Sequence, residues 1–142
     1  MNLGPIIIIE DDEGDKALLE EVFAGLDYRN ELIFFEDGQD ALDFLNATGK
    51  NLSPFLILSD INMPKVNGFE LREKIKTDAE LNLRCIPYIF FSTAVSQQAL
   101  IDAYSASVQG FFVKQNNFEK LEKTIIVIME YWTMCEAPNR HE

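Results

Sequence analysis

The chain has 142 residues, of which 47% are hydrophobic and 25% charged, so it is long enough to bury one core and has too ordinary a composition for a disordered or fibrous protein. Its 12 basic and 24 acidic side chains give a net charge of −12, which argues against nucleic-acid binding because phosphate backbones would be repelled. The sequence has neither a signal-like start nor an apolar run near the roughly 20 residues of a membrane span, so we expect a cytoplasmic protein without membrane association. We expect one domain over residues 1–142, with its core at about 4–134 and a polar tail at 136–142.

Short apolar runs alternate with helical patterns along the whole chain, which predicts βαβ units and a single parallel sheet. The second helix should stop near Gly49, while Asn67, Ser96 and Asn117 are placed to cap the third, fourth and fifth helices. The polar stretch 76–84 reads as a long exposed connection. The expected fold class is therefore α/β, with helices on both faces of a five-stranded parallel sheet, its strands at 6–9, 32–35, 55–58, 86–91 and 111–113.

The last predicted helix is more apolar than a surface helix needs to be. One face carries a regular core stripe, but Ile126, Val127 and Tyr131 lie off that face. Either neighbouring segments cover these side chains, or they form an exposed patch that binds a partner. We favour the patch slightly.

Polar side chains follow four of the predicted strands at the point where each strand ends. Glu10 and Asp11 follow the first strand, Asp60 the third, Ser92 the fourth and Lys114 the fifth. The carboxyl ends of parallel strands share one edge of the sheet, where ligands bind, so these groups should converge. Taken singly, each has a plainer explanation, since an Asp after a strand is more often a turn former or a helix cap. Their joint placement favours a site.

Three carboxylates at one edge repel one another, and their pKa values would rise unless a cation lay between them. Oxygen ligands suit Mg²⁺, for which Asp11 and Asp60 would be direct ligands, Glu10 would hold a metal-bound water and Asn62 would offer its backbone carbonyl. Asp60 could then accept a phosphoryl group as a nucleophile, with Lys114 and the Ser92 hydroxyl stabilising its charge. The nearby acids Asp12, Glu13 and Asp15 are interpreted as first-turn residues that favour a helix N-terminus.

The motifs Ile-Glu-Asp after the first strand, Ser-Asp-Ile-Asn-Met-Pro-Lys-Val-Asn-Gly around Asp60, Ser-Thr-Ala from Ser92 and Val-Lys at Lys114 together resemble the receiver domain of bacterial two-component response regulators. The layout is most similar to the stand-alone regulators associated with phytochrome-type and other sensor histidine kinases. The resemblance spans nearly the whole chain and implies a flavodoxin-like receiver fold with strand order 2-1-3-4-5.

By that resemblance Asp60 is the phospho-acceptor, Glu10 and Asp11 are the acidic pair, and Lys114 contacts the phosphate. It also implies that Ser92 is the switch hydroxyl and Phe111 the switch aromatic. The family usually has Lys-Pro with a cis peptide bond after the fifth strand, whereas this chain has Lys114-Gln115. A cis bond before a residue other than proline costs about 3–4 kcal/mol, so we expect a trans bond here.

The expected function is that of a single-domain response regulator. A sensor histidine kinase would donate a phosphoryl group to Asp60 with Mg²⁺ bound, and the signal would pass to a downstream protein, or to a second copy of the chain, through the fourth helix, fifth strand and fifth helix. No turnover chemistry is expected beyond self-catalysed phosphotransfer and autodephosphorylation, no other cofactor is implied, and His141 in the tail is no plausible internal donor.

The sequence leaves three alternatives open. The first is an interaction module with the same fold that works without phosphorylation, which the intact set of polar residues argues against. The second is a Mg²⁺-dependent phosphohydrolase, which would need a general acid where Asn62 stands. A flavodoxin-like cofactor binder is the weakest, because the acidic edge would repel a flavin phosphate.

Overall fold

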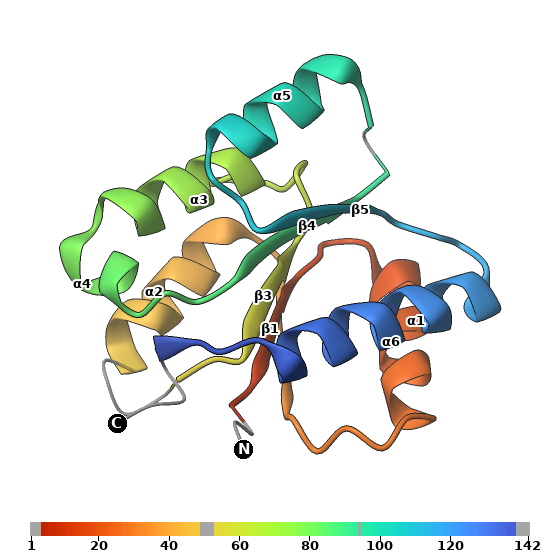
Figure 1. Cartoon of the computed structure of the whole chain (residues 1–142). Coiled ribbons are helices and arrows are strands. Elements are labelled where there is room, and N and C mark those ends of the chain that lie inside the picture. Colours follow the sequence, from red (N-terminus) through yellow and green to blue (C-terminus); the bar gives the residue numbers. More distant parts are fainter. Residues whose placement is uncertain (1–3, 49–52, 94, 139–142) are drawn as a thin grey trace.

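A computed structural model describes residues 4–48, 53–93 and 95–138, which build a five-stranded parallel sheet with helices on both faces (Figure 1). The strand order is β2-β1-β3-β4-β5, which confirms the order that the family resemblance implied. The strands are β1 (Ile6–Ile9), β2 (Leu32–Phe35), β3 (Leu56–Ser59), β4 (Tyr88–Ser92) and β5 (Gly110–Val113).

The helices lie in two layers. Helices α1 and α6 cover one face of the sheet, and α2, α3 and α5 cover the other (Figure 1). Their bounds are α1 (Glu13–Ala24), α2 (Gly38–Thr48), α3 (Gly68–Thr77), α4 (Ala79–Leu83), α5 (Gln97–Ser105) and α6 (Phe118–Met134). Within the described ranges, none of these helices combines the length and the apolar character needed to cross a membrane.

The central strand β1 explains why the core has two halves. Its four isoleucines are at most 1% exposed, and successive side chains of a strand point to opposite faces. Ile7 and Ile9 therefore pack into the cluster beneath α2, α3 and α5, while Ile6 and Ile8 pack into the cluster beneath α1 and α6. A run of β-branched residues is what a strand buried on both faces requires.

The predicted helix caps are confirmed. The Asn67 side chain accepts a hydrogen bond from the Glu70 amide, and the Glu70 carboxylate accepts one from the Asn67 amide, which forms a capping box for α3. The Ser96 side chain caps α5 by accepting a hydrogen bond from the Ala99 amide, and the Asn117 side chain caps α6 by accepting one from the Lys120 amide. Helix α2 ends at Thr48, and Gly49 lies outside the described residues.

The prediction for residues 76–84 was wrong. This stretch finishes α3 and then forms the short helix α4, whose N-cap Asp78 accepts hydrogen bonds from the amides of Glu80 and Leu81. Leu81 is only 2% exposed and anchors the helix to the core. The fourth strand also begins later than predicted, at Tyr88, directly after Pro87, which has no N–H to donate to a neighbouring strand.

The extra apolar residues of α6 are largely uncovered. Val127 is 52% exposed and Tyr131 is 60% exposed, while Ile126 is half-buried. Trp132 packs against the core beneath α1 and α6, with its ring 5.0 Å from that of Tyr131. In the tail, Ala137 is buried, and His141 falls outside the described residues. The exposed patch is thus present on α6, and what binds it stays a prediction.

Candidate functional site

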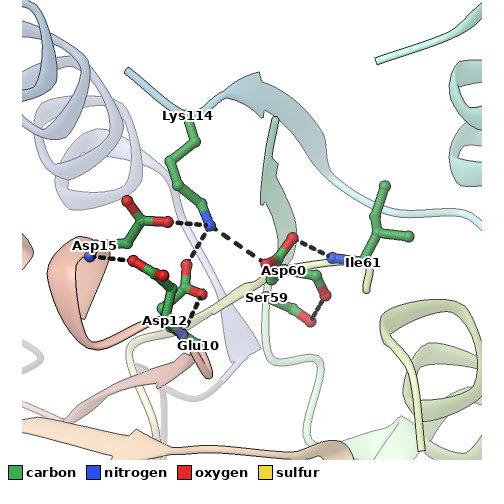
Figure 2. A network of polar contacts seen from close by, with 7 residues as sticks. All are labelled: Glu10, Asp12, Asp15, Ser59, Asp60, Ile61 and Lys114. Carbon is green, nitrogen blue, oxygen red and sulfur yellow. Dashed lines mark hydrogen bonds and ion pairs between the residues drawn. The ribbon is translucent and has the colours of Figure 1, made fainter. Parts of the chain in front are cut away.

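Glu10, Asp60 and Lys114 meet at the carboxyl edge of the sheet, as their positions after three strands predicted. Ile9 is paired with Ser59 in the register of β1 and β3, so the next residues, Glu10 and Asp60, leave the sheet side by side. Lys114 follows β5 and reaches across to both carboxylates (Figure 2). Because β1 is flanked by β2 and β3, this edge is where the strand order reverses.

Lys114 lies at the centre of an ion-pair cluster rather than in solvent. Its side chain is 6% exposed, and its ammonium nitrogen contacts a carboxylate oxygen of Glu10, Asp15 Oδ2 at 3.1 Å and Asp60 Oδ2 at 3.3 Å (Figure 2). The Lys114 backbone amide donates to the Ser92 carbonyl at 3.0 Å, which fixes the start of the side chain against β4. The Lys114 ammonium therefore forms ion pairs with three carboxylates.

Burial and charge act in opposite directions on the pKa of Lys114. Burial alone would lower it, but the hydrogen bond to Glu10 and the negative charges of Asp60, Glu10 and Asp15 outweigh that effect and raise the pKa above its ordinary value. The pKa of Glu10 is also raised, because burial disfavours its charged form more than Lys114 and the Asp12 amide stabilise it. Lys114 is therefore cationic, whereas burial disfavours the charged carboxylate of Glu10, its closest partner.

Asp60 is held by its own backbone surroundings. Its amide donates to the Ile9 carbonyl at 3.0 Å, and its Oδ1 accepts a hydrogen bond from the Ile61 amide at 2.7 Å. The carboxylate is therefore oriented with Oδ1 toward the following turn and Oδ2 toward Lys114. The side chain is 12% exposed, so the group is restrained but can be reached from solvent.

The N-terminus of α3 packs directly on the loop that starts at Asp60. The Gly68 amide donates to the Ile61 carbonyl at 2.9 Å, and a Cβ at Gly68 would lie 2.4 Å from the Asp60 carbonyl oxygen. The Tyr88 hydroxyl lies 2.9 Å from the Gly68 carbonyl oxygen and 3.0 Å from Ser59 Oγ, which itself donates to the Asp60 carbonyl at 2.8 Å. A fully buried tyrosine thus ties α3 to the strand that carries Asp60.

Three carboxylates could hold a metal ion here. Ligand oxygens of Glu10, Asp11 and Asp60 lie within 4.8 Å of one another, with Asp11 exposed and Glu10 buried. An all-oxygen set with one face open to water suits a hard divalent cation such as Mg²⁺, which keeps several waters. Asn62 is exposed, two residues beyond Asp60, and the role of its carbonyl stays a prediction.

The two predicted switch residues lie on β4 and β5. Ser92 is the last residue of β4 and is fully buried, so the hydroxyl belongs to the strand rather than to the turn after it. Phe111 is half-buried, with its ring 6.0 Å from that of Phe90. Among the described residues no peptide bond is cis, which confirms the expected trans bond at Lys114-Gln115.

Asp15 is the site residue that sequence reasoning missed. It lies in the first turn of α1, as expected, but its carboxylate also contacts Lys114. Helix α1 begins at Glu13, only a few residues after β1 ends at Ile9, so its first turn stays close to the carboxyl edge of the sheet, and that short connection is the signal that could have placed Asp15 there.

Comparisons with known proteins agree with this geometry. Residues 6–126 match the response regulator receiver domain. The chain is 34% identical to the probable methanogenesis regulatory protein FilR2 of Methanothrix harundinacea, over 89% of the chain and 82% of that protein. It is 32% identical to response regulator Rcp1 of Synechocystis sp., over 89% of the chain and 87% of Rcp1.

Two solved structures extend the likeness. The Mn²⁺-bound form of Rcp1 superposes with a TM-score of 0.79 at 31% identity, covering 94% of this chain and 97% of that one. The phosphorylated cyanobacterial phytochrome response regulator RcpA superposes with a TM-score of 0.81 at 30% identity, covering 94% and 96%. The chain therefore belongs to the response regulator receiver domain family, and among its members it resembles regulators such as Rcp1 and RcpA that consist of little more than this domain.

Proposed function

We propose that the protein accepts a phosphoryl group on Asp60 from a phosphohistidine of a sensor histidine kinase, in a reaction that depends on Mg²⁺. A carboxylate oxygen of Asp60 would form the new P–O bond while the P–N bond breaks and the imidazole leaves with the bonding electrons. The observation that carries the proposal is the contact of the restrained Asp60 carboxylate with a buried, cationic Lys114. Phosphoryl transfer needs charge neutralisation more than covalent help, and this lysine supplies a fixed positive charge.

The remaining roles follow from where the residues lie. Asp11 and Asp60 would be direct ligands of Mg²⁺, Glu10 would hold one of its waters, and Asn62 would offer its backbone carbonyl. When bound, the metal would neutralise charge on the transferred group. The phosphoryl group would draw in the Ser92 hydroxyl, which would donate a hydrogen bond to a phosphoryl oxygen. The Phe111 side chain would turn inward in response. The likeness to a Mn²⁺-bound and to a phosphorylated regulator supports this assignment.

The test is intact-mass spectrometry after incubation with acetyl phosphate, with and without Mg²⁺. We expect one phosphoryl adduct on the wild type that requires Mg²⁺ and is lost in Asp60→Asn. Asp37→Asn is the matched control, because Asp37 also follows a strand and is 5% exposed, and asparagine keeps its cap on the Asp40 amide. An adduct retained in Asp60→Asn would move the acceptor elsewhere, and no adduct on the wild type would favour a constitutive interaction module.

We further propose that phosphorylation acts through a surface on α5, β5 and α6, which adjoin at one edge of the sheet (Figure 1). Exposed apolar side chains occur on all three elements: Ile101, Tyr104, Val113, Val127 and Tyr131. The partner would be a downstream protein or a second copy of the chain.

Sedimentation with and without phosphodonor tests the homodimer. We expect a mass increase on phosphorylation that Tyr131→Glu abolishes. Leu83→Glu should leave the increase intact, since Leu83 is 77% exposed on α4, which is not one of the three elements of this surface. A monomer under both conditions would refute the dimer.

A further inference from the structure

Asp15 contacts Lys114 but is not one of the three carboxylates grouped as a metal site. The contact is 3.1 Å long, and the Asp15 side chain is 33% exposed, so one of its faces is turned to the lysine and another to solvent. The inference below rests on the proposed function, because it assigns Asp15 a part in the same phosphotransfer.

The other two carboxylates that contact Lys114, those of Asp60 and Glu10, would also take part in phosphorylation or metal binding. Asp60 gives up its carboxylate charge when it becomes an acyl phosphate. Glu10 is buried at 3% exposure, and its carboxylate oxygens lie within reach of the place where a cation would bind. If Glu10 interacts with the metal site and Asp60 carries the phosphoryl group, Asp15 is the one of these three carboxylates that can pair with Lys114 throughout the reaction.

Asp15 is itself held in place by its local backbone. Its amide donates to Asp12 Oδ2 at 2.8 Å, and the Asp12 amide donates to Glu10 Oε2 at 3.1 Å, so these three acids are joined through the start of α1 (Figure 2). A lysine ammonium sits on a flexible four-carbon stem and needs such external restraint to be held at one position. The residue after Lys114 is Gln115, so no proline ring restrains the backbone at that point.

We propose that Asp15 is a positioning residue for Lys114: its carboxylate, anchored in the first turn of α1, keeps the ammonium beside Asp60 while phosphate is transferred. It does not bind the metal and does not touch the transferred group. Its loss should lower the maximal rate of phosphorylation without changing how much Mg²⁺ is needed to reach half of that rate.

The experiment measures phosphorylation by acetyl phosphate over a series of Mg²⁺ concentrations in four proteins: wild type, Asp15→Asn, Asp15→Glu and Glu13→Gln. We expect Asp15→Asn to lower the maximal rate about five- to tenfold, since small misplacements of a catalytic group cost at least this much. Asp15→Glu should lie within about twofold of wild type because it keeps a carboxylate on the same helical turn. Glu13→Gln is the matched control, as it removes one negative charge from the same turn at an exposed position.

Each other outcome overturns the inference. An unchanged maximal rate in Asp15→Asn would mean that Asp15 does not assist Lys114. A raised maximal rate would mean that Asp15 competes with the phosphoryl group for the Lys114 ammonium. A higher Mg²⁺ requirement with the maximal rate restored would make Asp15 a metal residue. An equal change in Glu13→Gln would reduce the effect to net charge. Failure of the wild type to take up phosphate would instead refute the proposed function, so the two failures are distinguishable.

Discussion

Gly68 leaves no room for a side chain beside the loop that starts at Asp60, and Gly68→Ala should therefore lower the free energy of unfolding. The new Cβ would lie 2.4 Å from the Asp60 carbonyl oxygen, 2.7 Å from Phe90 Cε1 and 3.0 Å from Ile61 Cα. Two of these three neighbours are backbone atoms, which cannot move aside as the end of a flexible side chain can. Overpacking of a core costs about 1–3 kcal/mol, and we place this substitution at about 2–3 kcal/mol because the backbone must shift.

Urea denaturation and thermal melting measure this loss. For a chain of this length, a loss of about 2–3 kcal/mol corresponds to a fall in Tm of roughly 6–12 °C. Because the displaced backbone carries Asp60, phosphorylation should slow as well, by on the order of tenfold or more. Gly25→Ala is the control, since its Cβ would meet nothing closer than 3.7 Å and its φ of −85° suits alanine. A Gly68→Ala protein within about 0.5 kcal/mol of wild type would refute the steric argument.

Two further substitutions test the polar interior. Lys114→Met leaves the buried Glu10 and the nearly buried Asp60 without their cation, and it should lower the free energy of unfolding by about 3–5 kcal/mol in urea denaturation without metal. Added Mg²⁺ should restore part of that stability. A loss below about 1 kcal/mol would contradict the assigned ion pairs. Tyr88→Phe removes the hydroxyl beside Gly68 and Ser59 and should cost about 1–2 kcal/mol at neutral pH. The pKa values of Lys114 and Tyr88 are both raised in the fold, so above about pH 10 the unfolded chain holds fewer protons than the folded chain, and stability should fall as pH rises. Tyr88→Phe should reduce that alkaline slope by about one proton, or about 1.4 kcal/mol per pH unit, and an unchanged slope would contradict the assignment.

The strands and helix caps could be predicted from sequence because their signals are local. Ile6–Ile9 has the composition of a strand buried on both faces, and Asn67, Ser96 and Asn117 stand directly before helical patterns. The order of the strands depends on long-range packing that spacing does not encode, and it was available only through the family resemblance.

The errors have physical causes that periodicity does not reveal. Helix α4 spans a single turn with one buried apolar residue, Leu81, so it leaves no repeating pattern in residues 76–84. Strand β4 begins at Tyr88 rather than at residue 86, because Pro87 has no N–H to donate to a neighbouring strand.

For the candidate site, the sequence predicted which residues would meet but not how they would share charge. Convergence follows from strand ends alone, and Glu10, Asp60 and Lys114 are brought together as expected. That Lys114 would be nearly buried, and that the Asp15 carboxylate would contact it, depends on side-chain conformations that are fixed only when α1 packs beside α6 on one face of the sheet. The roles of these residues in phosphotransfer remain predictions.

The position of Trp132 has a practical consequence for spectroscopy. It is the only tryptophan of the 142 residues, and it sits half-buried on α6 with its ring against that of the exposed Tyr131. Its emission therefore comes from one known place, beside the apolar patch and not at the acidic edge. A change in intrinsic fluorescence when phosphodonor or a binding partner is added would report on the α6 surface directly, in the unlabelled protein and in real time.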